Sequence, residues 1–186
     1  MQQALAAQRG GSIGDAKRLY ALVLSIDPVN AAAYGNLAVI AAREGDLANA
    51  ERLIRQELKL RPNHAASHNN LGTLLLQQGR PADAASAHRH AIRLNPNYAQ
   101  AHLALGNALK AQHNFDEAMQ SYRAAVAIKP DYAEAHNNIG VVLQMQGRLD
   151  EAASAYRKAA AVRAYVEASF NLGVVLHQMR DLDAAD

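Results

Sequence analysis

The 186-residue sequence predicts an all-α fold, an α-solenoid of stacked helix–turn–helix units. Two recurrences and one pattern support this prediction. Proline recurs every 34 residues, at Pro28, Pro62, Pro96 and Pro130. Alanine recurs at the same step, at Ala16, Ala50, Ala84, Ala118 and Ala152. Within each unit, apolar residues follow the i, i+3, i+4, i+7 spacing of a helix face, which is typical of an α-helical repeat protein.

The period sets the expected boundaries of the repeats within a single array. Full units are expected at residues 31–64, 65–98, 99–132 and 133–165, with a partial unit at 1–30 and a truncated unit at 166–186. The fourth unit is one residue short, in the segment RAYVEA at 163–168, where earlier units have proline. Because a solenoid normally ends in a polar capping helix, we expect either a longer protein or an array that continues by self-association.

Each unit is expected to contain two helices of about 13 residues, roughly 20 Å long. The turn between them is marked by Gly45, Gly79 and Gly147. We expect Asp46 and Asn114 to cap the second helix and Pro81 to lie in its first turn. The residues that follow the later prolines are expected to cap the next first helix: Asn63, Asn97 and Asp131.

We number the positions of each full unit from 1 at its first residue. Small and polar residues that recur at fixed positions predict how the helices pack. Glycine at position 8 is unfavourable inside a helix, and its recurrence indicates a close approach of two helices: Gly72, Gly106 and Gly140. The expected buried face of the second helix comprises positions 20, 24 and 27, where Glu57 and His88 are polar exceptions.

The pattern of a large residue, Leu-Gly starting three residues later, alanine, an aromatic residue and a closing proline resembles the tetratricopeptide repeat. The resemblance covers nearly the whole chain and implies a right-handed superhelix whose first helices line a concave binding groove. Position 4 departs from the family, because histidine replaces the usual tryptophan at His68, His102 and His136. We expect these histidines to pack between neighbouring repeats.

A helical wheel places positions 5, 6, 9 and 13 of the first helix away from the packed face, and asparagine is frequent there. Its amide both donates and accepts hydrogen bonds, so a row of asparagines can bind a peptide backbone. The row is similar to the asparagine ladder of O-linked N-acetylglucosamine transferases, with Ala104 interrupting it. The alternative is that these amides bond to neighbouring repeats or to solvent. The expected groove residues are Asn36, Asn69, Asn70, Thr73, Asn107, Asn137, Asn138 and Asn171.

Composition argues against several functional classes. The 19 Lys and Arg residues nearly balance 17 Asp and Glu residues, so we expect no nucleic-acid partner. The absence of cysteine excludes disulfides and thiolate metal sites. No apolar run is long enough to span a bilayer, and the first residues lack a signal peptide's pattern. We therefore expect a cytoplasmic protein without membrane association.

The titratable residues do not form a recognisable catalytic or metal site. Equivalent histidines lie at least roughly 8–10 Å apart on neighbouring repeats, too far to share one zinc ion. The segment RGGSIGDAK at 9–17 lacks the spacing of a phosphate-binding loop. We therefore expect no metal, no cofactor and no catalytic residue.

The predicted function is a protein–protein interaction scaffold that binds an extended peptide or protein segment, without catalysis of its own. One alternative is the substrate-recruiting region of a larger enzyme, such as a glycosyltransferase. A further alternative is a self-assembling structural module, because we expect the last helix to expose apolar residues: Leu172, Val175 and Leu176.

Overall fold

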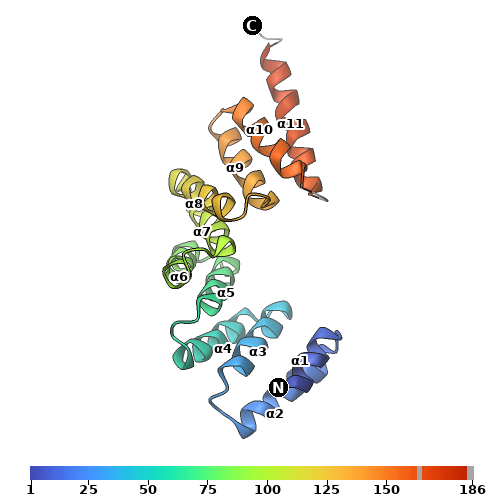
Figure 1. Ribbon diagram of the computed structural model, residues 1–186, viewed down its shortest axis with the longest axis vertical. Helices are drawn as coiled ribbons and strands as arrows, with labels where there is room; N and C mark the ends of the chain where they lie inside the picture. Colours follow the sequence, from blue (N-terminus) through green and yellow to red (C-terminus); the bar gives the residue numbers. More distant parts are fainter. Residues whose placement is uncertain (163–164, 184–186) are drawn as a thin grey trace. The chain divides into compact units, whose positions relative to one another are not determined.

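The computed structural model describes residues 1–162 and 165–183 (Figure 1). Arg163 and Ala164, in the segment with the predicted deletion, lie outside the described residues, as do residues 184–186 of the predicted truncated repeat. The described residues form eleven α-helices and no strand. The helices are α1 (Gln2–Arg9), α2 (Ile13–Ile26), α3 (Ala31–Arg43), α4 (Leu47–Leu60), α5 (Ala65–Gln77), α6 (Pro81–Leu94), α7 (Ala99–Ala111), α8 (Phe115–Ile128), α9 (Ala133–Met145), α10 (Leu149–Ala160) and α11 (Val166–Asp183). The predicted all-α class is confirmed.

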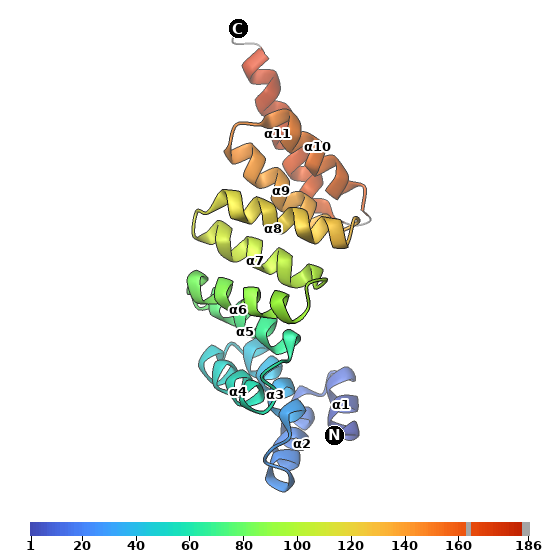
Figure 2. The ribbon, with the colours of Figure 1, turned by 60° about the vertical axis from the view of Figure 1, so that its left-hand side comes forward.

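The chain divides into two compact units, Met1–Pro96 and Asn97–Asp186. In the N-terminal unit α1 packs on α2, α3 on α4 and α5 on α6, while α2–α3 and α4–α5 contacts join successive pairs. In the C-terminal unit α7 packs on α8, α9 on α10, and α11 on both α10 and α9. Figures 1 and 2 show the two helices of each pair side by side. Each unit is therefore built of helix–turn–helix repeats.

The first helices of the full repeats begin at Ala31, Ala65, Ala99 and Ala133, 34 residues apart as the period predicts. Two predicted caps of second helices are also present. The Asp46 side chain accepts a hydrogen bond from the Asn49 amide at 3.2 Å, and Asn114 accepts one from the Glu117 amide at 3.4 Å. Pro81 is the first residue of α6.

The predicted caps Asn63, Asn97 and Asp131 are wrong. Each lies one residue too early, because the residues that directly precede α5, α7 and α9 are His64, Tyr98 and Tyr132, none of which makes a side-chain cap. In α5 and α9 a histidine of the first helical turn instead bonds to the preceding loop. His68 Nε2 donates to the Pro62 carbonyl at 2.7 Å, and His136 Nε2 donates to the Pro130 carbonyl at 2.8 Å. These two position-4 histidines thus fasten the loop that precedes their own helix.

The position-8 glycines lie where the two helices of a repeat approach closely, as predicted. A Cβ atom added to Gly72 would lie 2.6 Å from the His88 ring, and one added to Gly140 would lie 2.6 Å from the Tyr156 ring. Gly106 meets Tyr122 in the same way. Alanine at these positions would therefore force the facing ring to shift. The rings at position 24, those of His88, Tyr122 and Tyr156, are among the largest fully buried side chains.

The predicted exposure of Val175 is wrong, because α11 packs on α10 and α9 and buries this side chain completely. Leu172 is half-buried, whereas Leu176 is 41% exposed as predicted. The apolar residues most exposed on α11 are instead Val166 and Phe170, at 77% and 71%. None of the described helices is both long and apolar enough to cross a bilayer.

Candidate functional site

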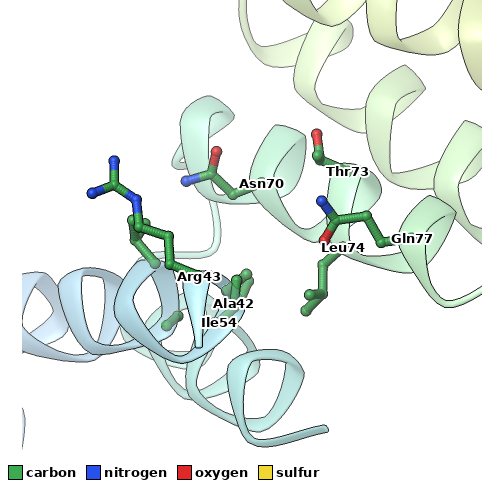
Figure 3. A pocket seen from close by; sticks show the side chains of 9 residues that line it. Ala42, Arg43, Ile54, Asn70, Thr73, Leu74 and Gln77 are labelled. Atoms are coloured by element: carbon green, nitrogen blue, oxygen red, sulfur yellow. The ribbon is translucent and has the colours of Figure 1, made fainter. Parts of the chain in front are cut away.

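A groove lies between α3 and α5, the first helices of two successive repeats in the N-terminal unit. Its first part is a pocket of about 270 Å³. Figure 3 shows Leu74, Ala42 and Ile54 on one side of it, with the polar ends of Arg43, Asn70 and Gln77 at the other. The pocket is lined by Ala38, Val39, Ala42, Arg43, Ile54, Asn70, Thr73, Leu74 and Gln77. It thus offers an apolar floor beneath a polar rim.

The second part is a pocket of about 250 Å³ that contains charged side chains. Val39 and Asn70 line both pockets, so the two adjoin, and together we call them the α3–α5 groove. The second pocket, here the Glu57 pocket, is lined by Ala32, Gly35, Asn36, Val39, Glu57, Arg61, His64, Ser67 and Asn70.

Three of the predicted groove residues line this groove, and they differ in their hydrogen bonds. Asn36 Nδ2 donates to the Ala32 carbonyl at 2.9 Å, and Thr73 Oγ1 donates to the Asn69 carbonyl at 3.2 Å. Asn70 is exposed, and its amide has no hydrogen-bond partner within the described part of the chain. Asn70 therefore keeps a donor and an acceptor free at the junction of the two pockets.

The predicted position of Asn69 and Asn137 on an open face is wrong. Asn69 is 2% exposed and its Oδ1 lies 3.0 Å from His88 Nδ1. Asn137 is 1% exposed, and its Oδ1 accepts a hydrogen bond from Asn171 Nδ2 at 3.0 Å. The helical wheel failed here because each first helix packs against helices on more than one side, so its buried arc is wider than one stripe.

Asn107 and Asn138 connect two neighbouring repeats of the C-terminal unit. Asn138 Nδ2 donates to Asn107 Oδ1 at 2.9 Å, and the Tyr122 hydroxyl donates to the same oxygen at 2.9 Å. Burial, followed by the nearby charge of Glu134, raises the pKa of Tyr122, so the phenol remains a proton donor. These amides, with Asn137 and Asn171, are thus engaged in the inter-repeat bonds that the sequence had left as an alternative.

The charged residues of the Glu57 pocket were not predicted as site residues. The sequence did contain a signal, because position 27 is alanine in the later repeats, at Ala91, Ala125 and Ala159, but glutamate in the first. Glu57 is 5% exposed. His64 Nδ1 lies 3.6 Å from its Oε1 and 2.7 Å from Ser67 Oγ. Over residues 1–162 and 165–183, no group of three or more His, Asp or Glu side chains is placed to hold a metal ion.

Comparison with protein families identifies the repeats. Profiles described as "Tetratricopeptide repeat" match residues 29–97, 89–120 and 133–163, and one described as "TPR repeat" matches residues 106–147. Residues 29–163 of this chain consist of tetratricopeptide repeats. No curated protein sequence matches this TPR chain.

Several solved structures share the fold of the TPR chain. A structure of MamA is 27% identical, covers 87% of this chain and 94% of its own, and has a TM-score of 0.79. YrrB, described as a TPR protein with an unusual peptide-binding site, is 21% identical, with coverages of 95% and 88% and a TM-score of 0.74. PilF of Pseudomonas aeruginosa is 19% identical, with coverages of 100% and 90% and a TM-score of 0.79. The fold is therefore that of a TPR solenoid.

Proposed function

We propose that this TPR chain is a protein-interaction scaffold, without catalytic activity of its own, that binds an extended segment of a partner protein in the α3–α5 groove. The observation that carries the proposal is the free amide of Asn70 beside the apolar floor formed by Leu74 and Ile54. An extended peptide has a free N–H and a free C=O at alternate residues, and one asparagine side chain can bond to both.

The groove also suits the side chains of such a peptide. Successive side chains of an extended strand point to opposite faces, so every second one would enter the groove while the others face solvent. The apolar floor favours an aliphatic or aromatic residue there. Thr73 and Gln77 lie on the rim with Asn70 and can orient the bound segment. YrrB has this fold and a peptide-binding site, so a peptide-binding role is compatible with the architecture.

A random peptide library displayed on phage tests the proposal. We expect the wild-type chain to enrich a family of peptides, and Asn70→Ala to weaken the best of them about 3- to 10-fold. Asn138→Ala serves as the matched control, because Asn138 lies outside the groove and bonds to Asn107. No enrichment by the wild-type chain, or equal affinity of the Asn70→Ala variant, would contradict groove binding.

A second candidate function is self-association through α11. Phe170 is 71% exposed and Val174 is 43% exposed, and both line an apolar pocket with Gly173 and His177. The same face of a second copy would cover these side chains. Sedimentation velocity over a wide concentration range should then show a dimer that Phe170→Glu dissociates. A wild-type chain that stays monomeric at the highest concentration would exclude this function.

A further inference from the structure

We infer that the Glu57 pocket is a specificity site for a basic residue, and that it binds the side chain of one lysine or arginine in the partner segment. This inference rests on the proposed peptide binding in the α3–α5 groove. Beyond that proposal, the inference specifies the chemical class of one residue of the bound segment and the pocket that this residue occupies.

The first argument is that the Glu57 carboxylate is buried without a permanent counter-charge. Glu57 accepts no hydrogen bond from any described residue, and the nearest basic atom, His64 Nδ1, is 3.6 Å away on a ring that is neutral unless protonated. Glu51, six residues earlier on α4, is also buried, but Arg80 Nη1 lies 3.0 Å from its Oε1 and Arg55 pairs with it as well. A buried carboxylate without such partners is unfavourable, and a ligand cation would supply the missing charge.

The second argument comes from comparing the repeats at positions 5 and 27. In the later repeats position 5 of the first helix has a larger, buried side chain and position 27 of the second helix is alanine; the position-5 residues are Asn69, Leu103 and Asn137. In the first repeat the small side chain is at position 5 and the large side chain is at position 27. Position 5 is Gly35, and a Cβ atom there would lie 2.6 Å from Glu57 Oε2 and 2.7 Å from Oε1. The carboxylate therefore lies directly over the glycine.

This exchange changes the chemistry of the repeat at these two positions. The later repeats pack with an asparagine or a leucine at position 5 and an alanine at position 27. Packing therefore does not require an acid at position 27. The exchange places a carboxylate in a pocket that is part of the α3–α5 groove. Gly35 leaves this place open, because a Cβ atom at that position would displace the carboxylate from it.

The third argument is the match between the pocket and a basic side chain. Val39 and Ala32 offer apolar surface for the aliphatic stem, while Asn36, Asn70 and Ser67 add side-chain oxygens to the lining of the same pocket. Arg61 also lines the pocket but is exposed, so solvent and salt screen its charge far more than that of Glu57. An acidic ligand residue would instead be placed against the buried carboxylate and is disfavoured.

Selection from the same random peptide library tests the inference. Peptides bound by the wild-type chain should share a lysine or arginine at one aligned position, and replacing that residue with norleucine should weaken binding at least about 10-fold. Glu57→Gln should weaken the parent peptide to a similar extent and make the norleucine replacement nearly neutral. Glu51→Gln, which removes a buried acid outside the groove, is the control and should bind as the wild type does.

A compensated variant keeps the test valid if Glu57→Gln folds poorly. Gly35→Leu combined with Glu57→Ala recreates the apolar pair of residue types found at Leu103 and Ala125, so it should fold and yet show no basic preference. Selected peptides without a shared basic position, or with one that Glu57→Gln binds equally well, would overturn the inference while leaving peptide binding intact. A library with no enriched peptides would overturn both.

Discussion

Nδ1 of His88 lies 3.0 Å from Oδ1 of Asn69 in the interface between α6 and α5. Because an amide oxygen can only accept, the ring carries its proton on Nδ1 and leaves Nε2 as a bare acceptor. Nε2 is buried and has no hydrogen-bond partner among the described residues. Tyrosines occupy the equivalent position in two later repeats, where their hydroxyl groups are bonded: Tyr122 to Asn107 and Tyr156 to Gln144.

This arrangement predicts that the stability of the N-terminal unit falls as the pH falls from about 6.5 towards 4. Burial lowers the pKa of His88 to about 4, whereas in the unfolded chain it is about 6.5. Between these values the unfolded chain binds a proton that the folded chain does not, so acidification favours unfolding. At pH values below about 4 the loss in the free energy of unfolding reaches about 3 kcal/mol. Urea unfolding at a series of pH values measures it.

A repacked interface should remove both the pH effect and the unpaired nitrogen. Asn69→Leu combined with His88→Tyr recreates the pair formed by Leu103 and Tyr122. We expect this double variant to be more stable than the wild type at neutral pH by about 1–2 kcal/mol, with a larger difference at pH 5. His88→Tyr alone should gain less, because it leaves the buried Asn69 amide unpaired. A double variant that melts below the wild type would show that the interface cannot accept a tyrosine.

Asparagines at the same repeat position should differ in their contribution to stability. Asn138→Ala removes the bond to Asn107 across two repeats and should lower the free energy of unfolding by about 1–2 kcal/mol. Asn70→Ala removes no bond within the described residues and should change it by less than about 0.5 kcal/mol. Chemical denaturation of the two variants measures the difference. Equal losses would mean that Asn70 has a structural role after all.

Arg43 should select a second residue of the bound segment. Arg43 is exposed in the first pocket, eight positions after Gly35 on α3, or about 12 Å along the helix. An extended peptide covers that distance in about three or four residues. We therefore expect selected peptides to prefer Asp or Glu at that spacing from the basic position, and Arg43→Glu to reverse the preference to Lys or Arg. An unchanged preference would place the peptide on another path.

Much of the fold follows from periodicity, because stacked repeats must present the same face at the same step. The first-helix starts at Ala31, Ala65, Ala99 and Ala133 needed only the positions of proline and glycine. The cap positions were wrong by one residue because proline sets the start of a turn but not its length. The bond from His68 to the Pro62 carbonyl decides how that turn closes, and a composition pattern does not contain it.

The candidate site was less predictable for a related reason. A wheel drawn for one helix has one buried stripe, whereas Asn69 and Asn137 lie on a side that neighbouring helices also cover. The free amide of Asn70 and the engaged amide of Asn138 occupy the same repeat position, and only their neighbours distinguish them. The Glu57 pocket required a comparison of two positions that lie 22 residues apart, Gly35 and Glu57.

The fit between Glu57 and Gly35 also restricts the order in which these two residues can have been acquired. From a pair such as Asn69 and Ala91, gaining the glutamate first would force its carboxylate into a filled space. Gaining the glycine first leaves only a small void, which a folded chain tolerates at a modest loss of stability. The route through a glycine-and-alanine intermediate avoids that clash. Engineers who wish to move the acidic site to another repeat must change both helices together.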